Sequence, residues 1–419
     1  MPPTPPPLVP SSSAALSAAL ATATETWKNE LKNLFEQAEV QYADVVWDIR
    51  DQDDLCTNEI WGHKVPHPGA LLESPGFYST QNSLSTPSLS LPLVSSCSQS
   101  RSPSPFGASQ SSHTPDPSGD NGTLLRVPLM LSPDQFRRQI EYLYAGEVGI
   151  VRELWLNVGS TAGSGSAAEM RRRNELRKDL LYMWKNPLYR DVRITVTGGS
   201  GSNNREVETA DFSSHRFILV SRVPYFRYLL SSAIAPVNQN ICSSNPLSLK
   251  LPTPPFTPKS LHFIFGFIYT GTLVFSTRPW GLETAFDIVR GAKYLELDTL
   301  GNEARARIIA ETMHGLFHAY LPFEEYDRLI EGKWGIGGCK CKQCQQHAPR
   351  VLMFALELRD DVLERGAQRA LVSMYGEGWT TSEFLALPSR WNSAKTQIVG
   401  KRSVAHYGTG YARGASVAP

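Results

Sequence analysis

The sequence predicts a mixed α/β (α+β) fold with two similar domains followed by a helical C-terminal region. The main reason is that one set of motifs occurs twice, in the same order, along the 419 residues. Each copy has an Asp-led strand, a His followed by a cation, an apolar segment, a short Leu-containing strand, and a helix ending in an aromatic, a small residue and Gly. The copies run from Ala43 to Glu147 and from Asp191 to Thr272. Their long separation indicates duplicated domains and not a solenoid of short units.

The second copy shows the expected elements most clearly. Apolar and polar residues alternate from Val192 to Val196, which predicts a strand with one buried face. The apolar stretch at residues 217–230 has helical spacing but contains Pro224, which predicts two short helices or one bent helix. Pro258 suits the first turn of a further helix, and Gly271 suits its end, where a left-handed residue is cheapest.

These motifs resemble the BTB/POZ domain family. Within residues 190–273 the family pattern appears as a strand starting at Asp191, a His-Arg step ending at Arg216, a Pro-Tyr-Phe helix ending at Phe226 and a Tyr-Thr-Gly end at Gly271. The apolar pattern of the following residues is similar to the closing helices of that family. The resemblance implies a small domain of strands and helical hairpins that binds other proteins.

The first copy is less regular. Residues 30–150 resemble a second, degraded BTB domain, because Pro66, Pro68 and Pro75 break the apolar segment that follows His63. The whole arrangement resembles fungal tandem-BTB proteins.

Changes in composition and periodicity predict the boundaries of the parts. Pro- and Ser-rich stretches indicate disorder, and a domain tolerates a long insert because the cost of loop closure grows slowly with length. The apolar spacing from Ile308 to Tyr320 predicts a helix. The predicted parts are a disordered tail at 1–13, a degenerate BTB-like domain at 14–150 with a disordered insert at 79–122, a linker and helix at 151–185, a BTB/POZ domain at 186–312, a helical C-terminal extension with a Cys-rich loop at 313–391, and a loose tail at 392–419.

Composition narrows the choice of partners and compartment. Forty-one basic and 40 acidic residues give a net charge of +1, so no nucleic acid or anionic membrane is expected as a partner. No apolar run approaches the ~20 residues of a membrane span, and the Pro-rich N-terminus does not have the pattern of a signal peptide. Six cysteines in so long a chain favour reduced thiols. We therefore expect a cytoplasmic or nuclear protein, or one found in both compartments.

Motifs of catalysis are missing. The sequence has no phosphate-binding Gly-Lys-Ser/Thr loop and no Gly-x-Ser-x-Gly elbow. The Gly-rich segment at 198–202 precedes strand-like residues instead of a helix, which predicts a hairpin turn. His215 stands near Ser214 and Asp211, but closeness in sequence is not triad geometry. The chain is not expected to be an enzyme, and His215 is expected to be structural.

The acid and the cation of each copy have two interpretations. The resemblance implies that Asp191 with Arg216, and Asp44 with Lys64, line a charged pocket near the dimer interface of the family. Alternatively, the acid and the cation satisfy each other and hold the strand to the helix. The second interpretation is favoured, since it applies to either copy whatever the copy binds.

The aromatic pair of the second copy also has two interpretations. The second BTB unit is expected to self-associate, because a domain of this size often leaves an apolar patch that a partner covers. Tyr225 and Phe226 belong either to that interface or to the core.

One cluster in the C-terminal extension has metal-binding chemistry. Cys339, Cys341, Cys344 and His347 supply three thiols and one imidazole, the ligands of a structural zinc site. His314 or His318, one helical turn apart if the segment is helical, is an alternative source of the imidazole. The other interpretation is an exposed loop of reduced thiols. No cofactor other than this zinc is expected.

The predicted function is that of a protein-interaction scaffold or adaptor, acting as a homo- or hetero-oligomer through its BTB domain. One variant docks a cullin scaffold, as a substrate adaptor for ubiquitin transfer. However, the loop at 233–246 has no acidic residue, whereas the family often places a hydrophobic-x-Glu motif there. The alternative is a regulatory, transcription-linked assembly, and an enzyme is a distant third.

Overall fold

The computed structural model describes residues 11–50, 57–65, 124–130, 132–145, 165–197, 209–234, 246–331, 333, 337–374 and 381–385. The chain divides into two compact units. The first comprises Met1–Thr26, Thr253–Phe267 and Thr272–Pro419, and the second comprises Trp27–Pro252 and Ile268–Gly271. Among the described residues, both sheets lie in the second unit.

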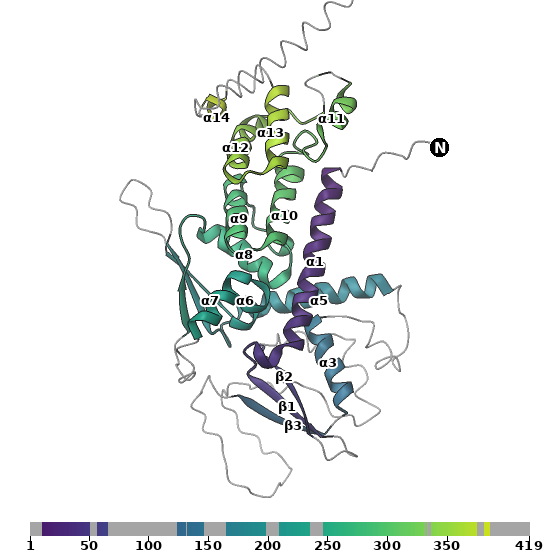
Figure 1. Cartoon of the computed structure of the whole chain (residues 1–419), viewed down its shortest axis with the longest axis vertical. Helices are drawn as coiled ribbons and strands as arrows, with labels where there is room; N and C mark the ends of the chain where they lie inside the picture. The colour runs from purple at the N-terminus through teal and green to yellow at the C-terminus, as the bar shows by residue number, and fades with distance from the viewer. Residues whose placement is uncertain are drawn as a thin grey trace, which may run out of the picture. The chain divides into compact units, whose positions relative to one another are not determined.

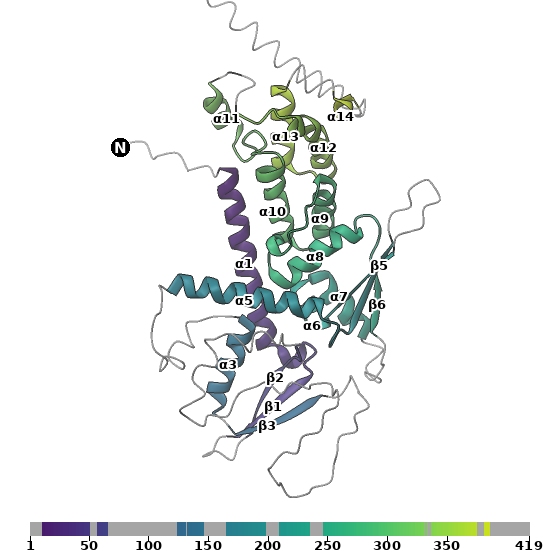
Figure 2. The same cartoon turned by 180° about the vertical axis from the view of Figure 1, so that it is seen from behind.

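The second unit contains two three-stranded sheets with the same topology. In each, the central strand pairs antiparallel with the next strand in the chain and parallel with the third. The strand orders are β2-β1-β3 and β5-β4-β6 (Figure 1 and Figure 2). The strands are β1 (Val45–Arg50), β2 (Thr57–Gly62), β3 (Leu125–Met130), β4 (Val192–Thr197), β5 (Thr209–Ser214) and β6 (Leu247–Lys250).

The registers of the two sheets are also the same. Val45 faces Gly62 on one side and Leu125 on the other, and Val192 faces Ser214 and Leu247 in the same way. The Asp before each central strand extends both ladders, since its backbone bonds to both neighbouring strands. The parallel pairing of β1 with β3 places segments on either side of the predicted insert in one sheet.

Several local predictions are confirmed in this unit. Val192, Ile194 and Val196 have no exposed surface, as the alternating pattern of β4 predicts. The apolar stretch that follows forms two helices, which are separated at Val223 because Pro224 cannot continue the first one. The helices here are η1 (Ala38–Val40), α3 (Pro133–Ala145), α5 (Gly165–Lys185), α6 (Arg216–Arg222) and α7 (Pro224–Ile234), together with the end of α1 (Ser12–Glu36).

The long helix α1 was not expected. It begins at Ser12, and residues 1–10 of the predicted tail at 1–13 lie outside the described residues. Its buried residues include Trp27, Leu31 and Leu34, at helical spacing.

The Pro-led helix occurs in both copies with the same length. α3 and α8 (Pro258–Thr270) each have 13 residues, begin with Pro and are followed by Gly. Gly271 has φ +68°, which confirms the predicted left-handed helix end. A Cβ at Gly271 would also lie 2.5 Å from Trp27 Cγ, so this position needs glycine for two independent reasons.

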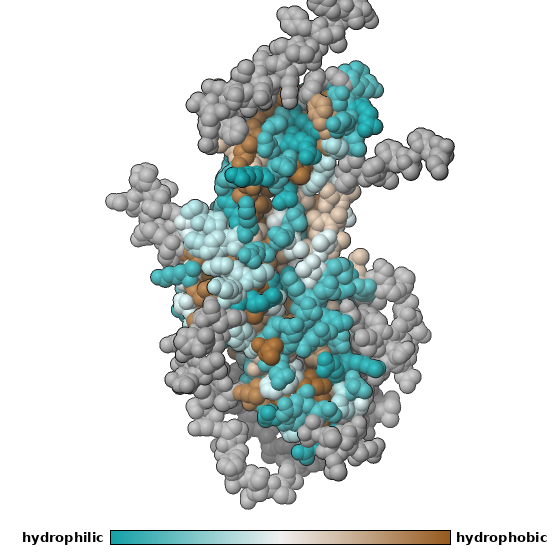
Figure 3. Space-filling view, viewed as in Figure 1, coloured by the Kyte–Doolittle hydropathy of each residue, from teal (hydrophilic) through white to brown (hydrophobic). Residues whose placement is uncertain are grey.

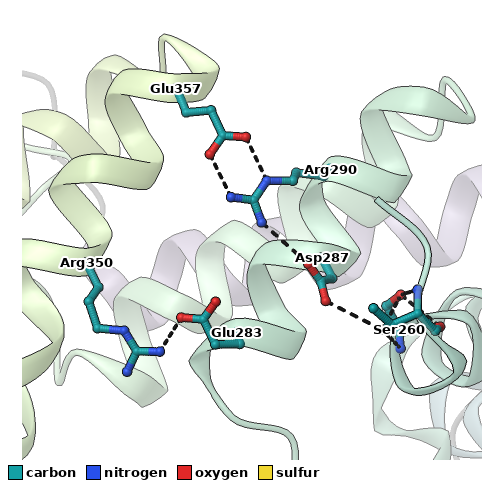
Figure 4. A network of polar contacts seen from close by, with 7 residues as sticks. Ser260, Glu283, Asp287, Arg290, Arg350 and Glu357 are labelled. Carbon is teal, nitrogen blue, oxygen red and sulfur yellow. Dashed lines mark hydrogen bonds and ion pairs between the residues drawn. The ribbon is translucent and has the colours of Figure 1, made fainter. Parts of the chain in front are cut away.

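The first unit is helical. Its elements are residues 12–26 of α1, most of α8, η3 (Leu273–Phe275), α9 (Leu282–Tyr294), α10 (Asp298–Arg307), η4 (Ile308–Thr312), α11 (Phe323–Ile330), α12 (Lys342–Leu358), α13 (Asp361–Ser373) and α14 (Ser382–Leu385). Charged pairs join α9 to α12 (Figure 4). Arg290 donates two hydrogen bonds, of 2.8 and 2.6 Å, to the carboxylate of Glu357, and Arg350 bonds to Glu283.

The predicted helix from Ile308 to Tyr320 is wrong in its second half. Residues 308–312 form a short π-helix, and residues 314–318 then have positive φ values between 39° and 96°. A left-handed backbone costs roughly 1–2 kcal/mol for each non-glycine residue. Leu316 and Phe317 are nevertheless buried, so packing of these side chains offsets part of that cost. His314 and His318 are therefore not one right-handed helical turn apart.

Some predictions concern residues that the structure does not describe. These are the insert at 79–122, the turn at 198–202, the tail at 392–419 and most of the loop at 233–246. Among the described helices, none is both long and apolar enough to cross a membrane.

Gly271 provides a test of the fold. Gly271→Ala forces an L-residue into the left-handed region and places its Cβ against Trp27, so we expect the free energy of unfolding to fall by about 2–5 kcal/mol. Gly301→Ala in α10 is the matched control, because a Cβ there would lie 3.7 Å from its nearest neighbour, the Cβ of Ala292. Helix propensity predicts that this control is neutral or slightly stabilising. Urea unfolding measures both, and equal effects would contradict the assignment.

Candidate functional site

A buried histidine–tyrosine network lies at the end of the second sheet. His215 Nε2 is 3.3 Å from Leu188 O, and a carbonyl only accepts, so Nε2 carries the proton. Burial lowers the pKa of His215 to about 4, so the ring is neutral at pH 7 and its Nδ1 accepts. The Tyr269 hydroxyl therefore donates to Nδ1 at 2.8 Å and accepts from the His215 backbone N–H at 3.1 Å. Its second acceptor position is filled by the Ser214 hydroxyl at 2.9 Å.

The first copy has the same network. His63 Nε2 is 2.8 Å from Gln41 O, and its Nδ1 is 2.8 Å from the Tyr144 hydroxyl. The His63 backbone N–H donates to that hydroxyl at 3.0 Å, and burial lowers the pKa of His63 to about 4. Gly62 stands where the second copy has Ser214, and a Cβ at Gly62 would lie 2.5 Å from the ring of Trp47.

The acid of each copy is held in the same way. The Asp191 carboxylate accepts from the Arg216 backbone N–H at 2.7 Å, and Asp44 accepts from the Lys64 backbone N–H at 2.6 Å. Arg216 Nε is also 3.2 Å from Asp191 Oδ2. This second contact is an ion pair and not an aligned hydrogen bond, because Nε has no hydrogen-bond partner among the described residues. The side chains of Asp191 and Arg216 thus pair in the second copy, whereas in the first copy the contact is with the Lys64 backbone, and the role of these residues stays a prediction.

These two networks meet inside the second unit. The His63 ring stacks on Phe217 of the second copy, with centroids 4.3 Å apart, and the Arg216 guanidinium lies over the Tyr42 ring of the first copy at 5.0 Å. Burial raises the pKa of Asp44 to about 6, and the charge of Asp191 adds to this rise while Lys64 opposes it. Burial also raises the pKa of Asp191, against the effect of Arg216.

The helix that precedes the first copy packs against the end of the second copy. The indole N–H of Trp27 in α1 donates to Tyr269 O at 3.0 Å, and both groups are buried. Arg222 of α6 is fully buried and pairs with Glu30 of α1 at 2.8 Å. A buried guanidinium without this carboxylate would be costly, so the pair fixes α1 in place.

The helix that precedes the second copy makes the reciprocal contact. The Arg172 guanidinium of α5 lies over the Tyr142 ring near the end of α3, at 4.5 Å from its centroid. α5 also crosses α1 (Figure 1 and Figure 2). Lys28 of α1 pairs with Glu169 of α5 at 3.3 Å, and the Arg177 guanidinium of α5 lies 5.3 Å from the centroid of the Trp27 ring. The two leading helices, α1 before the first copy and α5 before the second, therefore each contact the other copy.

The aromatic pair of α7 divides between two environments. Phe226 has no exposed surface and is a core residue, whereas Tyr225 is partly buried and contacts the Phe226 ring. The neighbouring Tyr228 is 79 % exposed. On the face drawn in Figure 3, the described hydrophobic residues form separate groups between hydrophilic ones.

Sequence reasoning missed Trp27, Glu30 and the roles of Tyr144 and Tyr269. The two tyrosines carried a signal, because they occupy the same position in two helices of equal length, each with a histidine in the preceding motif. Trp27 and Glu30 carried none, since their partners are about 200 residues away in the sequence.

The cysteine cluster forms a separate site in the first unit. His314, Cys339, Cys341 and Cys344 place their ligand atoms within 4.8 Å of one another, so this group could hold a metal. The imidazole is therefore His314 and not the predicted His347, and His318 also lies outside the group. A hydrogen bond from the Cys344 backbone lowers the pKa of Cys341 to about 7, and burial raises the pKa of Cys344.

Comparison with known families agrees with this architecture for the second copy. Residues 203–311 match the family model of the BTB/POZ domain. No match was found among curated proteins. The chain thus contains a BTB/POZ domain, which implies protein–protein interaction and dimerisation and is typically an interaction module. The match does not extend to the first copy, so the resemblance to tandem-BTB proteins stays a prediction.

The pKa of Asp44 predicts a pH-dependent effect of Asp44→Asn. Because the folded-state pKa is raised from 3.8 to about 6, the ionised carboxylate costs the folded state about 3 kcal/mol. This cost builds up as pH rises from about 4 to about 6, where only the unfolded state has lost the proton, and it is complete above pH 6. Asparagine keeps an acceptor oxygen for Lys64 but cannot ionise. We expect the variant to gain stability relative to the wild type between pH 4 and pH 7.

His63 and His215 are present in both the wild type and the Asp44→Asn variant, so their pH-dependent contribution to stability cancels in this comparison. Urea unfolding at several pH values measures the difference. A difference that does not change with pH would contradict the proposed burial of Asp44.

Proposed function

We propose that this protein is an interaction scaffold in which the first copy pairs, within the same chain, with the BTB/POZ domain of the second copy. The observation that carries the proposal is the reciprocal packing of the leading helices, above all the buried bond from Trp27 to Tyr269 O. The His–Tyr geometry is the same in both copies, and in each the Asp accepts from the backbone N–H of the cation residue, which supports treating the first copy as a degenerate BTB-like domain. The C-terminal helical extension follows the second copy.

Pairing within one chain has a thermodynamic advantage. Two tethered partners meet at an effective concentration in the mM range when the linker can span the distance, so they associate without a second molecule. A dimer of identical subunits uses the same patch twice. Here the two patches differ. Phe217 of the second copy stacks on His63, whereas Val65, which occupies the equivalent position in the first copy, is exposed.

The partners of the scaffold are proposed to be other proteins. We propose two versions of this role, a cullin-dependent substrate adaptor and a regulatory, transcription-linked assembly protein, in the cytoplasm, the nucleus or both. The three described cysteines are free thiols, which supports a reducing compartment. Neither an enzymatic role nor direct binding of nucleic acid or membrane is part of the proposal.

Trp27→Ala tests the pairing. It removes a fully buried side chain at the contact between the copies, so we expect a loss of about 3–5 kcal/mol in the free energy of unfolding. Because the contact is intramolecular, the unfolding midpoints of the wild type and of the Trp27→Ala variant should each stay constant over about a hundredfold range of protein concentration. Val274→Ala, at a residue that is 65 % exposed, is the control and should leave stability nearly unchanged. A midpoint that rises with concentration in the wild type would instead show pairing between two chains.

Affinity purification of the full chain from its native cell tests the scaffold role. We expect stoichiometric protein partners by mass spectrometry. Cullin and its associated subunits would support the adaptor version, and chromatin proteins the regulatory version. Recovery of the chain without any partner would contradict both.

A further inference from the structure

We propose that His314, Cys339, Cys341 and Cys344 bind one structural zinc ion. Three thiolates and one imidazole are a common ligand set of structural zinc, and zinc in such sites is four-coordinate and tetrahedral. All four ligand atoms lie within 4.8 Å of one another in the first unit. The proposal is independent of the pairing of the two copies.

The distances between the ligand atoms fit a tetrahedral centre. With bonds of about 2.3 Å to sulfur and 2.0–2.1 Å to nitrogen, a tetrahedral angle places each sulfur about 3.6 Å from the imidazole nitrogen. His314 Nδ1 lies 3.3 Å from Cys339 Sγ, 3.7 Å from Cys341 Sγ and 3.5 Å from Cys344 Sγ. One imidazole nitrogen cannot make three separate hydrogen bonds, but it and three sulfurs can all point at one cation.

Two parts of the backbone bring these ligands together. His314 begins the left-handed segment 314–318, which turns the chain after the π-helix. The thiols stand at the start of α12, where Cys341 is the N-cap and Cys344 lies in the first turn. The positive end of the helix dipole at that position favours thiolates, the form that binds zinc.

Glycine packing keeps the two parts in contact. A Cβ at Gly338 would lie 2.4 Å from the ring of Phe317, so the loop before Cys339 rests directly on the left-handed segment. Arg369 of α13 donates to His318 O at 2.8 Å and to Leu321 O at 2.9 Å, which holds the end of the same segment. Zinc at His314 would hold its beginning, where the left-handed backbone is otherwise unfavourable.

The filled ligand set determines the role of the ion. Four protein ligands leave no position for a water molecule, so the site would be structural and not catalytic. The ion would join residue 314, which closely follows the matched BTB/POZ region, to the start of α12.

Elemental analysis of the full chain, purified with a histidine-free tag, tests the proposal directly. We expect one zinc per chain in the wild type. His347→Ala is the matched control, since His347 is the histidine nearest to the thiols in sequence but lies outside the group. This control should retain the zinc, whereas His314→Ala should lose it to a chelator concentration that leaves the wild type loaded.

A second measurement covers the case in which His314→Ala does not fold. Cobalt(II) added to the chelator-treated wild type should give intense visible bands of tetrahedral cobalt and near-ultraviolet thiolate charge-transfer bands, and zinc should displace them. Wild-type protein with neither stoichiometric zinc nor this cobalt spectrum would overturn the proposal. Loss of zinc in His347→Ala with retention in His314→Ala would overturn the ligand assignment.

Discussion

The buried tyrosine hydroxyl at the end of each Pro-led helix is the constraint on which the second unit depends. In the second copy, the Tyr269 hydroxyl donates to His215 and accepts from the His215 backbone and Ser214, so all its hydrogen-bonding capacity is used. Leaving one buried polar group without a hydrogen bond costs about 1–3 kcal/mol. Because several groups bond to this one hydroxyl, its removal would leave all of them unsatisfied. The hydroxyl thereby fixes the strand end, the histidine and the helix end relative to one another.

The same constraint explains how the two copies differ. Where the second copy has Ile194 and Ser214, the first has Trp47 and Gly62. The larger ring of Trp47 fills the space of a side chain at position 62, so the two changes are coupled by packing. Gly62 cannot supply the hydrogen bond that Ser214 gives to the tyrosine of the second copy, whereas Trp47 packs edge-on against Phe136, with ring centroids 5.4 Å apart.

Local patterns in the sequence predicted the strands, the Pro-led helices and the left-handed glycine because each depends on residues close in the chain. The repeat predicted the equal topology of the sheets for the same reason. Contacts between the copies were not predictable, because Trp27, Glu30 and Tyr42 have no pattern that names a distant partner. The metal-site histidine was misassigned because His347 is the histidine nearest to the thiols in sequence, whereas the left-handed segment at 314–318 brings His314 to them instead. Only that turn brings His314 to the thiols.

The central claim is that the two copies pair within one chain, and carbodiimide cross-linking of mixed isotopes tests it most directly. Lys28 of α1 and Glu169 of α5 are 3.3 Å apart and can form a zero-length amide. Equal amounts of unlabelled and isotope-labelled full-length protein are refolded together, cross-linked and digested. Pairing within the chain predicts that both peptides of the 28–169 cross-link carry the same label. Cross-linked peptides with mixed labels, in amounts comparable to the unmixed ones, would contradict the account.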